Sequence, residues 1–201
     1  MSSTTFYQLV VDASGSMSGS ETSTVSSMNE QIALVRRLSK EHADEQFLLG
    51  IADFSSDLRV LREMSPIDKI EDVAMNEYTV RDITALYDAL GSSVTRMESA
   101  HLERQNNSED SFVVVVITDG AENASFHYNL NTLKSLLTRL ENNGNWEFRF
   151  IGADFLTDDF TAQLGLHNAK SYYVDKAEMS QASQYMDVEM QNLMRKKKGI
   201  I

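Results

Sequence analysis

Near the start of the 201-residue chain, one carboxylate and two hydroxyls occupy alternating positions, at Asp12, Ser14 and Ser16. The apolar run at residues 6–11 predicts a buried strand. The three side chains therefore leave the carboxyl end of that strand on a short loop that contains a glycine. Carboxylate and hydroxyl oxygens are hard ligands, which suit a small divalent cation such as Mg²⁺. This segment predicts one part of a metal site.

Two residues further along the chain carry the same kinds of oxygen donor. Asp119 follows the apolar run at residues 112–117, and Thr84 lies just ahead of a helical pattern that starts at Ala85. In a doubly wound sheet, ligands bind beyond the carboxyl ends of the strands, where the strand order reverses. We expect the first strand and the valine-rich strand to flank that point, which would bring Asp12 and Asp119 together.

The spacing of these five residues resembles the metal-ion-dependent adhesion site of von Willebrand factor A domains: Asp12, Ser14, Ser16, Thr84 and Asp119. Two longer stretches, at residues 118–125 and 146–153, are similar to stretches of intracellular bacterial and phage members of that family. The resemblance extends over nearly the whole chain. It implies the Rossmann-like fold of the family and an intact adhesion site.

By this resemblance, the hydroxyls of Ser14, Ser16 and Thr84 would contact the metal directly, and Asp12 and Asp119 would act partly through bound waters. Neutral hydroxyls leave the cation under-neutralised, so its open position attracts a carboxylate from another protein. We therefore expect a non-catalytic domain that binds Mg²⁺, with Mn²⁺ or Ca²⁺ as alternatives, and captures an Asp or Glu of a partner protein. Two other functions stay open: a hydrolase whose metal activates water, and an assembly subunit with a vestigial site.

Each of these residues also has an ordinary structural explanation. Serines such as Ser14 and Ser16 are common in loops and at helix N-caps. Thr84 or Asp82 would cap the helix that follows them, and Asp119 begins an Asp-Gly pair of a kind common in turns. Taken together, however, three independent segments that converge with oxygen donors favour the metal site.

Two further carboxylates raise the question of whether they tune the site. Related domains often carry glycine two residues before the threonine, where this chain has Asp82. Asp82 either caps a helix or adds negative charge near the metal, which would raise cation affinity and weaken the attraction for a partner's carboxylate. The same two interpretations apply to Glu122, just past Asp119.

The elements that must position these residues alternate between strands and helices. Strands are predicted at residues 7–11, 46–54, 57–61, 113–117, 146–151 and 172–174, and helices at 22–40, 85–105, 130–140, 158–164 and 180–195. The β-branched run at 113–117 predicts a central parallel strand, and the tight connection before 57–61 predicts a short antiparallel edge strand. The fold class is therefore α/β, with a doubly wound, mostly parallel sheet and helices on both faces.

One segment breaks this alternation. Residues 63–82 contain Pro66, the only proline of the chain, and lack a sustained hydrophobic period. We predict a long connection with at most a short helical turn at 67–73. Long connections in compact domains are often functional, and this one would deliver Thr84 to the site.

The chain carries a formal net charge of −12. Nucleic-acid binding requires a basic surface for phosphate contacts, so we expect no nucleic-acid partner. The basic cluster at residues 195–198 is interpreted as a solvated helix end that complements the helix dipole, with a docking tail as the alternative. The sequence does not indicate the oligomeric state.

Signals for catalysis are poor. Residues 15–19 have the spacing of a nucleophile elbow, but Met17 stands where the serine must be. The chain has no cysteine, which excludes disulfides and thiol chemistry. The histidines lack the i, i+4 pairing of a helical zinc site: His42, His101, His127 and His167. A general base outside the predicted ligands is also missing, which argues against the hydrolase.

The length and even composition predict one domain over residues 1–201, with its core at about 5–195 and a frayed tail at 196–201. No segment approaches the length that spans a membrane. The first residues lack the basic region and long apolar run of a signal peptide. We therefore expect a cytoplasmic location and no membrane contact.

Overall fold

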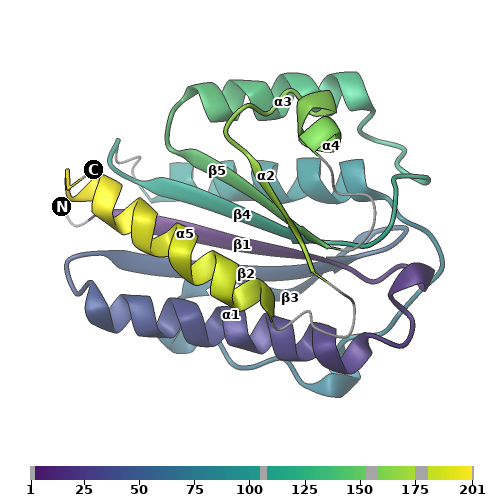
Figure 1. The fold of residues 1–201 in the computed structure, drawn as a ribbon, viewed down its shortest axis with the longest axis horizontal. Coiled ribbons are helices and arrows are strands. Elements are labelled where there is room, and N and C mark those ends of the chain that lie inside the picture. Colours follow the sequence, from purple (N-terminus) through teal and green to yellow (C-terminus); the bar gives the residue numbers. More distant parts are fainter. Residues whose placement is uncertain (1–2, 105–107, 153–157, 175–180, 201) are drawn as a thin grey trace.

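The computed structural model describes residues 3–104, 108–152, 158–174 and 181–200 (Figure 1). The strands are β1 (Thr4–Asp12), β2 (Gln46–Phe54), β3 (Leu58–Pro66), β4 (Ser111–Ile117), β5 (Trp146–Gly152) and β6 (Lys170–Tyr173). The α-helices are α1 (Glu21–Glu41), α2 (Leu86–Glu103), α3 (Leu130–Asn142), α4 (Asp158–Gln163) and α5 (Ala182–Lys197). Three short 3-10 helices are η1 (Gly15–Met17), η2 (Ile67–Lys69) and η3 (Met75–Glu77).

The strands form one sheet in the order β3-β2-β1-β4-β5-β6. Only β3 runs antiparallel to its neighbour, and it lies at the edge of the sheet. The other pairs are parallel. The chain builds outward from β1 to β3 and then returns to place β4 on the other side of β1, so the strand order reverses between β1 and β4. The predicted fold class is confirmed, including the position of the switch point.

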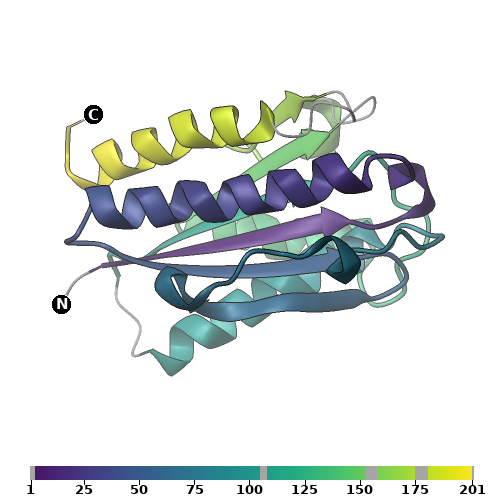
Figure 2. The ribbon, with the colours of Figure 1, turned by 90° about the horizontal axis from the view of Figure 1, so that it is seen from below.

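The central strands are apolar on both faces because helices cover both. Tyr7, Leu9 and Val11 of β1 pack in the cluster that includes α1 and α5, whereas Phe6 and Val10 pack with α2 and α3. Figures 1 and 2 show α1 and α5 side by side on one face and α2 on the other. Alternating apolar residues that face opposite layers hold β1 in place and fix where its carboxyl end emerges.

The edge strand β3 is longer than the predicted 57–61 and occupies the start of the expected connection. It continues to Pro66, which pairs with Leu48, and its register shifts on both sides of Ile51. Proline is tolerated here because the free side of an edge strand needs no backbone donor. The predicted helical turn at 67–73 is reduced to η2, and η3 follows it.

The C-terminal helix extends past the predicted end at residue 195. Helix α5 runs to Lys197, whose ammonium group pairs with the buried carboxylate of Glu45. The Lys198 ammonium nitrogen lies 3.5 Å from Asp44 Oδ1. These contacts dock part of the basic cluster against the domain, in the region where a frayed tail was expected. The predicted first residue of this helix, Ser180, lies outside the described residues.

Within the described ranges, no helix is both long and apolar enough to cross a bilayer.

Candidate metal centre

Asp12 is the last residue of β1, and its side chain is fully buried at the switch point. Its Oδ1 accepts a hydrogen bond from the Ser14 backbone N–H at 2.7 Å, and its Oδ2 accepts one from the Thr118 hydroxyl at 2.5 Å. Burial raises the pKa of the Asp12 carboxyl, the two hydrogen-bond donors oppose that shift, and the nearby charge of Asp119 adds to it. A cation placed here would offset this unfavourable burial of negative charge.

The loop after β1 joins Asp119 through a chain of side-chain hydrogen bonds. The Ser14 and Ser16 hydroxyl oxygens lie 3.0 Å apart, and the Ser16 hydroxyl donates to Asp119 Oδ1 at 2.6 Å. Ser14 occupies the N-cap position of η1, but its side chain makes no capping hydrogen bond. The hydroxyl of Ser14 therefore contacts the Ser16 hydroxyl and does not cap the backbone of η1.

Thr84 meets the same group of oxygens around Gly120. A Cβ atom built on Gly120 would lie 3.1 Å from Ser16 Oγ, 3.1 Å from Thr84 Oγ1 and 3.2 Å from Asp12 Oδ2. Oxygens from the segment 12–16 and from Thr84 thus lie close together beside the backbone of Gly120, where any side chain would crowd them. The structure brings all five predicted residues together at the carboxyl ends of β1 and β4.

This donor set fits a hard divalent cation. It combines two carboxylates with three neutral hydroxyls, all of them oxygen ligands of the kind that Mg²⁺ prefers. No group of three His, Cys, Asp or Glu side chains suited to a metal occurs among the described residues. Any site here must therefore use hydroxyls as well as carboxylates. Metal binding by these five residues stays a prediction.

Thr84 is held in place by Asn123 from the loop after Asp119. The Thr84 backbone N–H donates to Asn123 Oδ1 at 2.9 Å, and the Asn123 backbone N–H donates to the Thr84 carbonyl at 3.0 Å. Because both backbone groups of Thr84 are paired with one residue, the threonine and the Asp119 loop are fixed relative to each other.

The same loop caps helix α2. The backbone N–H of Tyr87 donates to Glu122 Oε2 at 2.9 Å, and that of Asp88 donates to Ser125 Oγ at 3.0 Å. Glu122 also accepts from the backbone N–H groups of Ala124 and Ser125. The helix therefore receives its N-terminal cap from a distant loop, while Ala85 at its N-cap position makes no side-chain cap.

Asp88, near the start of α2, in turn holds the backbone of the loop. Its carboxylate accepts hydrogen bonds from the backbone N–H groups of Phe126, His127 and Tyr128, at 2.6 to 3.1 Å. Burial alone would raise the pKa of Asp88, but the three backbone donors together lower it. The loop and the start of α2 thus form one hydrogen-bonded unit.

A second clamp holds the segment that precedes Thr84. Asp53, fully buried near the end of β2, pairs with Arg59 and with Arg81, the latter at 3.0 Å. The Arg81 backbone N–H donates to the Ala13 carbonyl at 2.6 Å, and the Tyr78 hydroxyl donates to the Asp12 carbonyl at 2.6 Å. The long connection is therefore tied to the loop that carries Ser14 and Ser16.

The structure gives one of the two extra carboxylates a definite role. Glu122 is committed to backbone and hydroxyl donors, so it is a capping residue. The side chain of Asp82 is exposed, and its backbone carbonyl accepts a hydrogen bond from the Gly15 N–H at 3.3 Å.

The sequence did not indicate the roles of Thr118 and Asn123, although both lie in the stretch 118–125 that carries the resemblance. No sequence pattern around Asp53 indicated that it supports the site.

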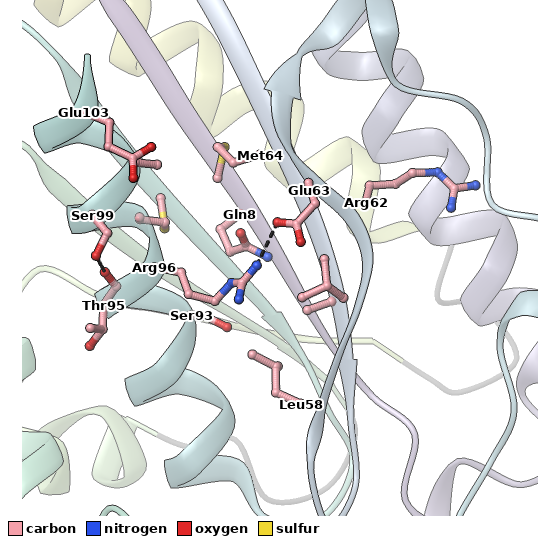
Figure 3. A pocket seen from close by; sticks show the side chains of 14 residues that line it. Gln8, Leu58, Arg62, Glu63, Met64, Ser93, Thr95, Arg96, Ser99 and Glu103 are labelled. Atoms are coloured by element: carbon pink, nitrogen blue, oxygen red, sulfur yellow. Dashed lines mark hydrogen bonds and ion pairs between the residues drawn. The ribbon is translucent and has the colours of Figure 1, made fainter.

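A separate cavity of about 380 Å³ lies between β3 and α2 (Figure 3). Gln8 of β1 and Ser93 of α2 line it. Arg96 of α2 and Glu63 of β3 form an ion pair of 2.7 Å that joins the two walls. The cavity contains none of the five predicted ligands.

Comparison with known protein families decides the classification. The model of the von Willebrand factor type A domain matches residues 8–122, which is more than half of the chain and includes all five predicted ligands. The chain belongs to the von Willebrand factor type A family. None of the curated proteins compared with it matches in sequence.

Solved structures share the fold of this von Willebrand factor A domain at low sequence identity. A von Willebrand factor type A protein from Catenulispora acidiphila has a TM-score of 0.65 at 15% identity, covering 92% of this chain and 42% of its own. The PilB minor pilin from Streptococcus sanguinis has a TM-score of 0.62 at 11% identity, covering 95% and 62%. The SpRpn10 VWA domain has a TM-score of 0.58 at 13% identity, and the match covers 87% of this chain and 91% of that domain. The chain therefore spans less than two thirds of the first two proteins.

Proposed function

We propose that this domain binds Mg²⁺, with Mn²⁺ or Ca²⁺ as alternatives, and uses the ion to capture an acidic residue of a partner protein. The ligands are the carboxylates of Asp12 and Asp119 and the hydroxyls of Ser14, Ser16 and Thr84. The observation that carries the proposal is that oxygens of Asp12, Ser16 and Thr84 meet beside Gly120, while Asp119 from a third segment accepts a hydrogen bond from Ser16. Similarity of residues 118–125 and 146–153 to intracellular family members supports a cytoplasmic location.

An adhesive role accounts for the site better than a catalytic one. A hydrolase needs a general base that is free to take a proton near the metal. Two of the carboxylates near the ligands are otherwise engaged: Glu122 caps α2, and Asp88 binds three backbone amides. The metal supplies an electrostatic anchor when bound, and the chain's own residues hold it in position.

Calorimetric titration with Mg²⁺ and Mn²⁺ tests the metal site. The wild type should bind one equivalent, and Asp12→Ala should lose binding because the buried carboxylate contributes charge that no neighbour replaces. Asp72→Ala is the matched control, since Asp72 is an exposed aspartate whose partner is Arg36. Equal binding by the wild type and Asp12→Ala, or none by either, would contradict the proposal.

Partner capture is tested by a pull-down from the native host with and without chelator. A partner that donates Asp or Glu should be lost in chelator and with Ser14→Ala or Thr84→Ala, which remove ligands without changing charge. Losing a contact at the centre of an interface costs about 2 kcal/mol or more, so affinity should fall well over tenfold. A partner that remains bound with unchanged affinity in excess chelator would place its interface elsewhere on the domain.

A further inference from the structure

Phe126 is a large apolar side chain that the fold leaves almost completely in solvent. It is 89% exposed, the highest value among the exposed large hydrophobic residues. Its backbone is nevertheless fixed, because its N–H donates to Asp88 Oδ2 at 2.8 Å and the next two residues donate to the same carboxylate. Its ring meets that of His127 edge to face, with centroids 5.4 Å apart. A fixed loop thus presents a bare aromatic ring.

Phe126 is linked to Thr84 of the candidate metal centre through Asn123 on its own loop and through Asp88 of α2. Asn123, which pairs with both backbone groups of Thr84, lies three residues before Phe126. Asp88, which holds the Phe126 N–H, lies four residues after Thr84. On the other side of Thr84, Ile83 is 44% exposed, and its carbonyl accepts from the Ser55 hydroxyl at 2.7 Å. Exposed apolar side chains therefore belong to both segments that position Thr84.

We infer that Phe126, together with Ile83, is the apolar half of the partner-binding surface. The partner then presents an apolar side chain within a few residues of the Asp or Glu that binds the metal. This inference rests on the proposed function. Aromatic anchors commonly dominate interfaces, and a ring on a loop that is already ordered avoids the entropy cost of ordering it on binding.

The alternative binding partner for this surface is a second copy of the chain. Each copy carries a net charge of −12, so the association of two identical acidic molecules is opposed by repulsion. A partner carboxylate, in contrast, would approach a bound dication. The charge balance therefore favours a different protein over self-association.

Synthetic peptides provide a defined probe. One set, blocked at both ends, carries a single glutamate and a single leucine separated by zero to three glycines. The matched set carries serine in place of leucine. Each peptide is titrated into ¹⁵N-labelled protein in Mg²⁺, with chelator as a parallel arm, and affinities are taken from amide chemical shifts. The proteins are the wild type, Phe126→Ala, Ile83→Ser and Leu102→Ala, the last being an exposed leucine at the other end of α2.

The wild type should bind at least one leucine peptide about five- to tenfold more tightly than its serine counterpart, as expected for partial burial of an aromatic ring. Phe126→Ala should erase this preference, Ile83→Ser should reduce it, and Leu102→Ala should leave it intact. Thermal unfolding of each variant verifies that the fold is retained.

The outcomes separate this inference from the proposed function. Chelator-sensitive binding with no leucine preference, or with a preference that survives Phe126→Ala, overturns the apolar surface and leaves the metal function standing. Binding that chelator does not weaken overturns the metal function. No measurable binding by any peptide at millimolar concentration contradicts both. Sedimentation that shows a wild-type dimer and a monomeric Phe126→Ala assigns the ring to self-association and also overturns the inference.

Discussion

At the scale of single residues, Thr118 decides the environment of the carboxylate at the candidate metal centre. Its hydroxyl donates to Asp12 Oδ2 at 2.5 Å and accepts from the Gly120 N–H at 3.2 Å. It therefore stabilises the buried charge of Asp12 and also fixes Gly120, beside which the oxygens of Asp12, Ser16 and Thr84 meet. Under the proposed function, Thr118 would tune the metal site without being one of its ligands.

We predict that Thr118→Val destabilises the domain by about 1.5–3 kcal/mol in chelator, because the buried carboxylate of Asp12 loses a charge-assisted hydrogen bond. Thr118→Ser, which keeps the hydroxyl, should lose less than half of that. Urea denaturation of the three proteins measures the effect. Equal losses in both variants would show that packing of the threonine methyl group matters and the hydroxyl does not.

At the scale of elements, the site depends on the contact between the loop after β4 and the start of α2. Neither element positions Thr84 alone, since its backbone pairs with Asn123 and the helix behind it is capped by Glu122. The carboxylate of Asp88 closes the unit from the helix side. Disrupting this unit should therefore affect metal affinity as well as stability.

For Glu122→Ala we expect a loss of about 1–2 kcal/mol, the usual effect of removing a helix cap, and a several-fold weaker Mg²⁺ affinity. Denaturation and calorimetry measure the two effects. Glu98→Ala is the matched control on α2, because Glu98 makes a partly exposed ion pair with Arg139, worth about 1 kcal/mol or less. Reduced stability with unchanged Mg²⁺ affinity would show that Thr84 is held without the cap.

The long connection before Thr84 carries its own pH-dependent contact. Hydrogen bonds from Arg62, and then from the Ala74 N–H, lower the pKa of Glu77 from 4.5 to about 2. A carboxyl whose pKa is lower in the folded state stabilises the fold above pH 4.5, and that stabilisation disappears as the pH falls toward 2. Because the Glu77 side chain is 36% exposed, solvent screens the pair and its contribution is about 1 kcal/mol.

Glu77→Gln should therefore lower the free energy of unfolding most at pH 7, and its difference from the wild type should shrink between pH 4.5 and pH 2. Urea denaturation across this range measures the difference. In an Arg62→Gln background the same substitution should have little effect at any pH, because the main source of the pKa shift is gone. A difference that stays constant with pH would contradict the ion-pair explanation.

At the scale of the whole molecule, the candidate site lies at the edge of a sheet that has apolar clusters on both faces. Its residues come from the end of β1, the loops after β1 and β4, and the connection into α2. The folded state assembles this set of ligands, so a cation bound there should stabilise the entire domain.

We predict that Mg²⁺ at about one hundred times its dissociation constant adds about 2.7 kcal/mol to the free energy of unfolding. For a domain of this size the melting temperature should rise by about 5–10 °C. Asp12→Ala should show no such rise, whatever its own melting temperature, and Asp72→Ala should show the full rise. A calorimetric scan with and without Mg²⁺ provides the measurement.

Local sequence patterns were sufficient for the main features of the fold. The mostly apolar run at residues 6–11 of β1 and the apolar run at 112–117 of β4 predict strands covered on both faces, and both are found between other parallel strands. The alternating donors at Asp12, Ser14 and Ser16 also share one loop, so their proximity follows from chain connectivity. For these features the determining interactions lie within a few residues, where periodicity and spacing are visible.

Tertiary structure decided what holds the site together. Thr84 pairs with Asn123 across 39 residues, and Glu122 caps α2 through Tyr87, 35 residues earlier. The edge strand β3 exceeds its predicted length because it pairs with β2, and not because of its own pattern. Hydrogen bonds between distant segments leave no period in the sequence, since each partner is an ordinary polar residue until the fold places it beside the other.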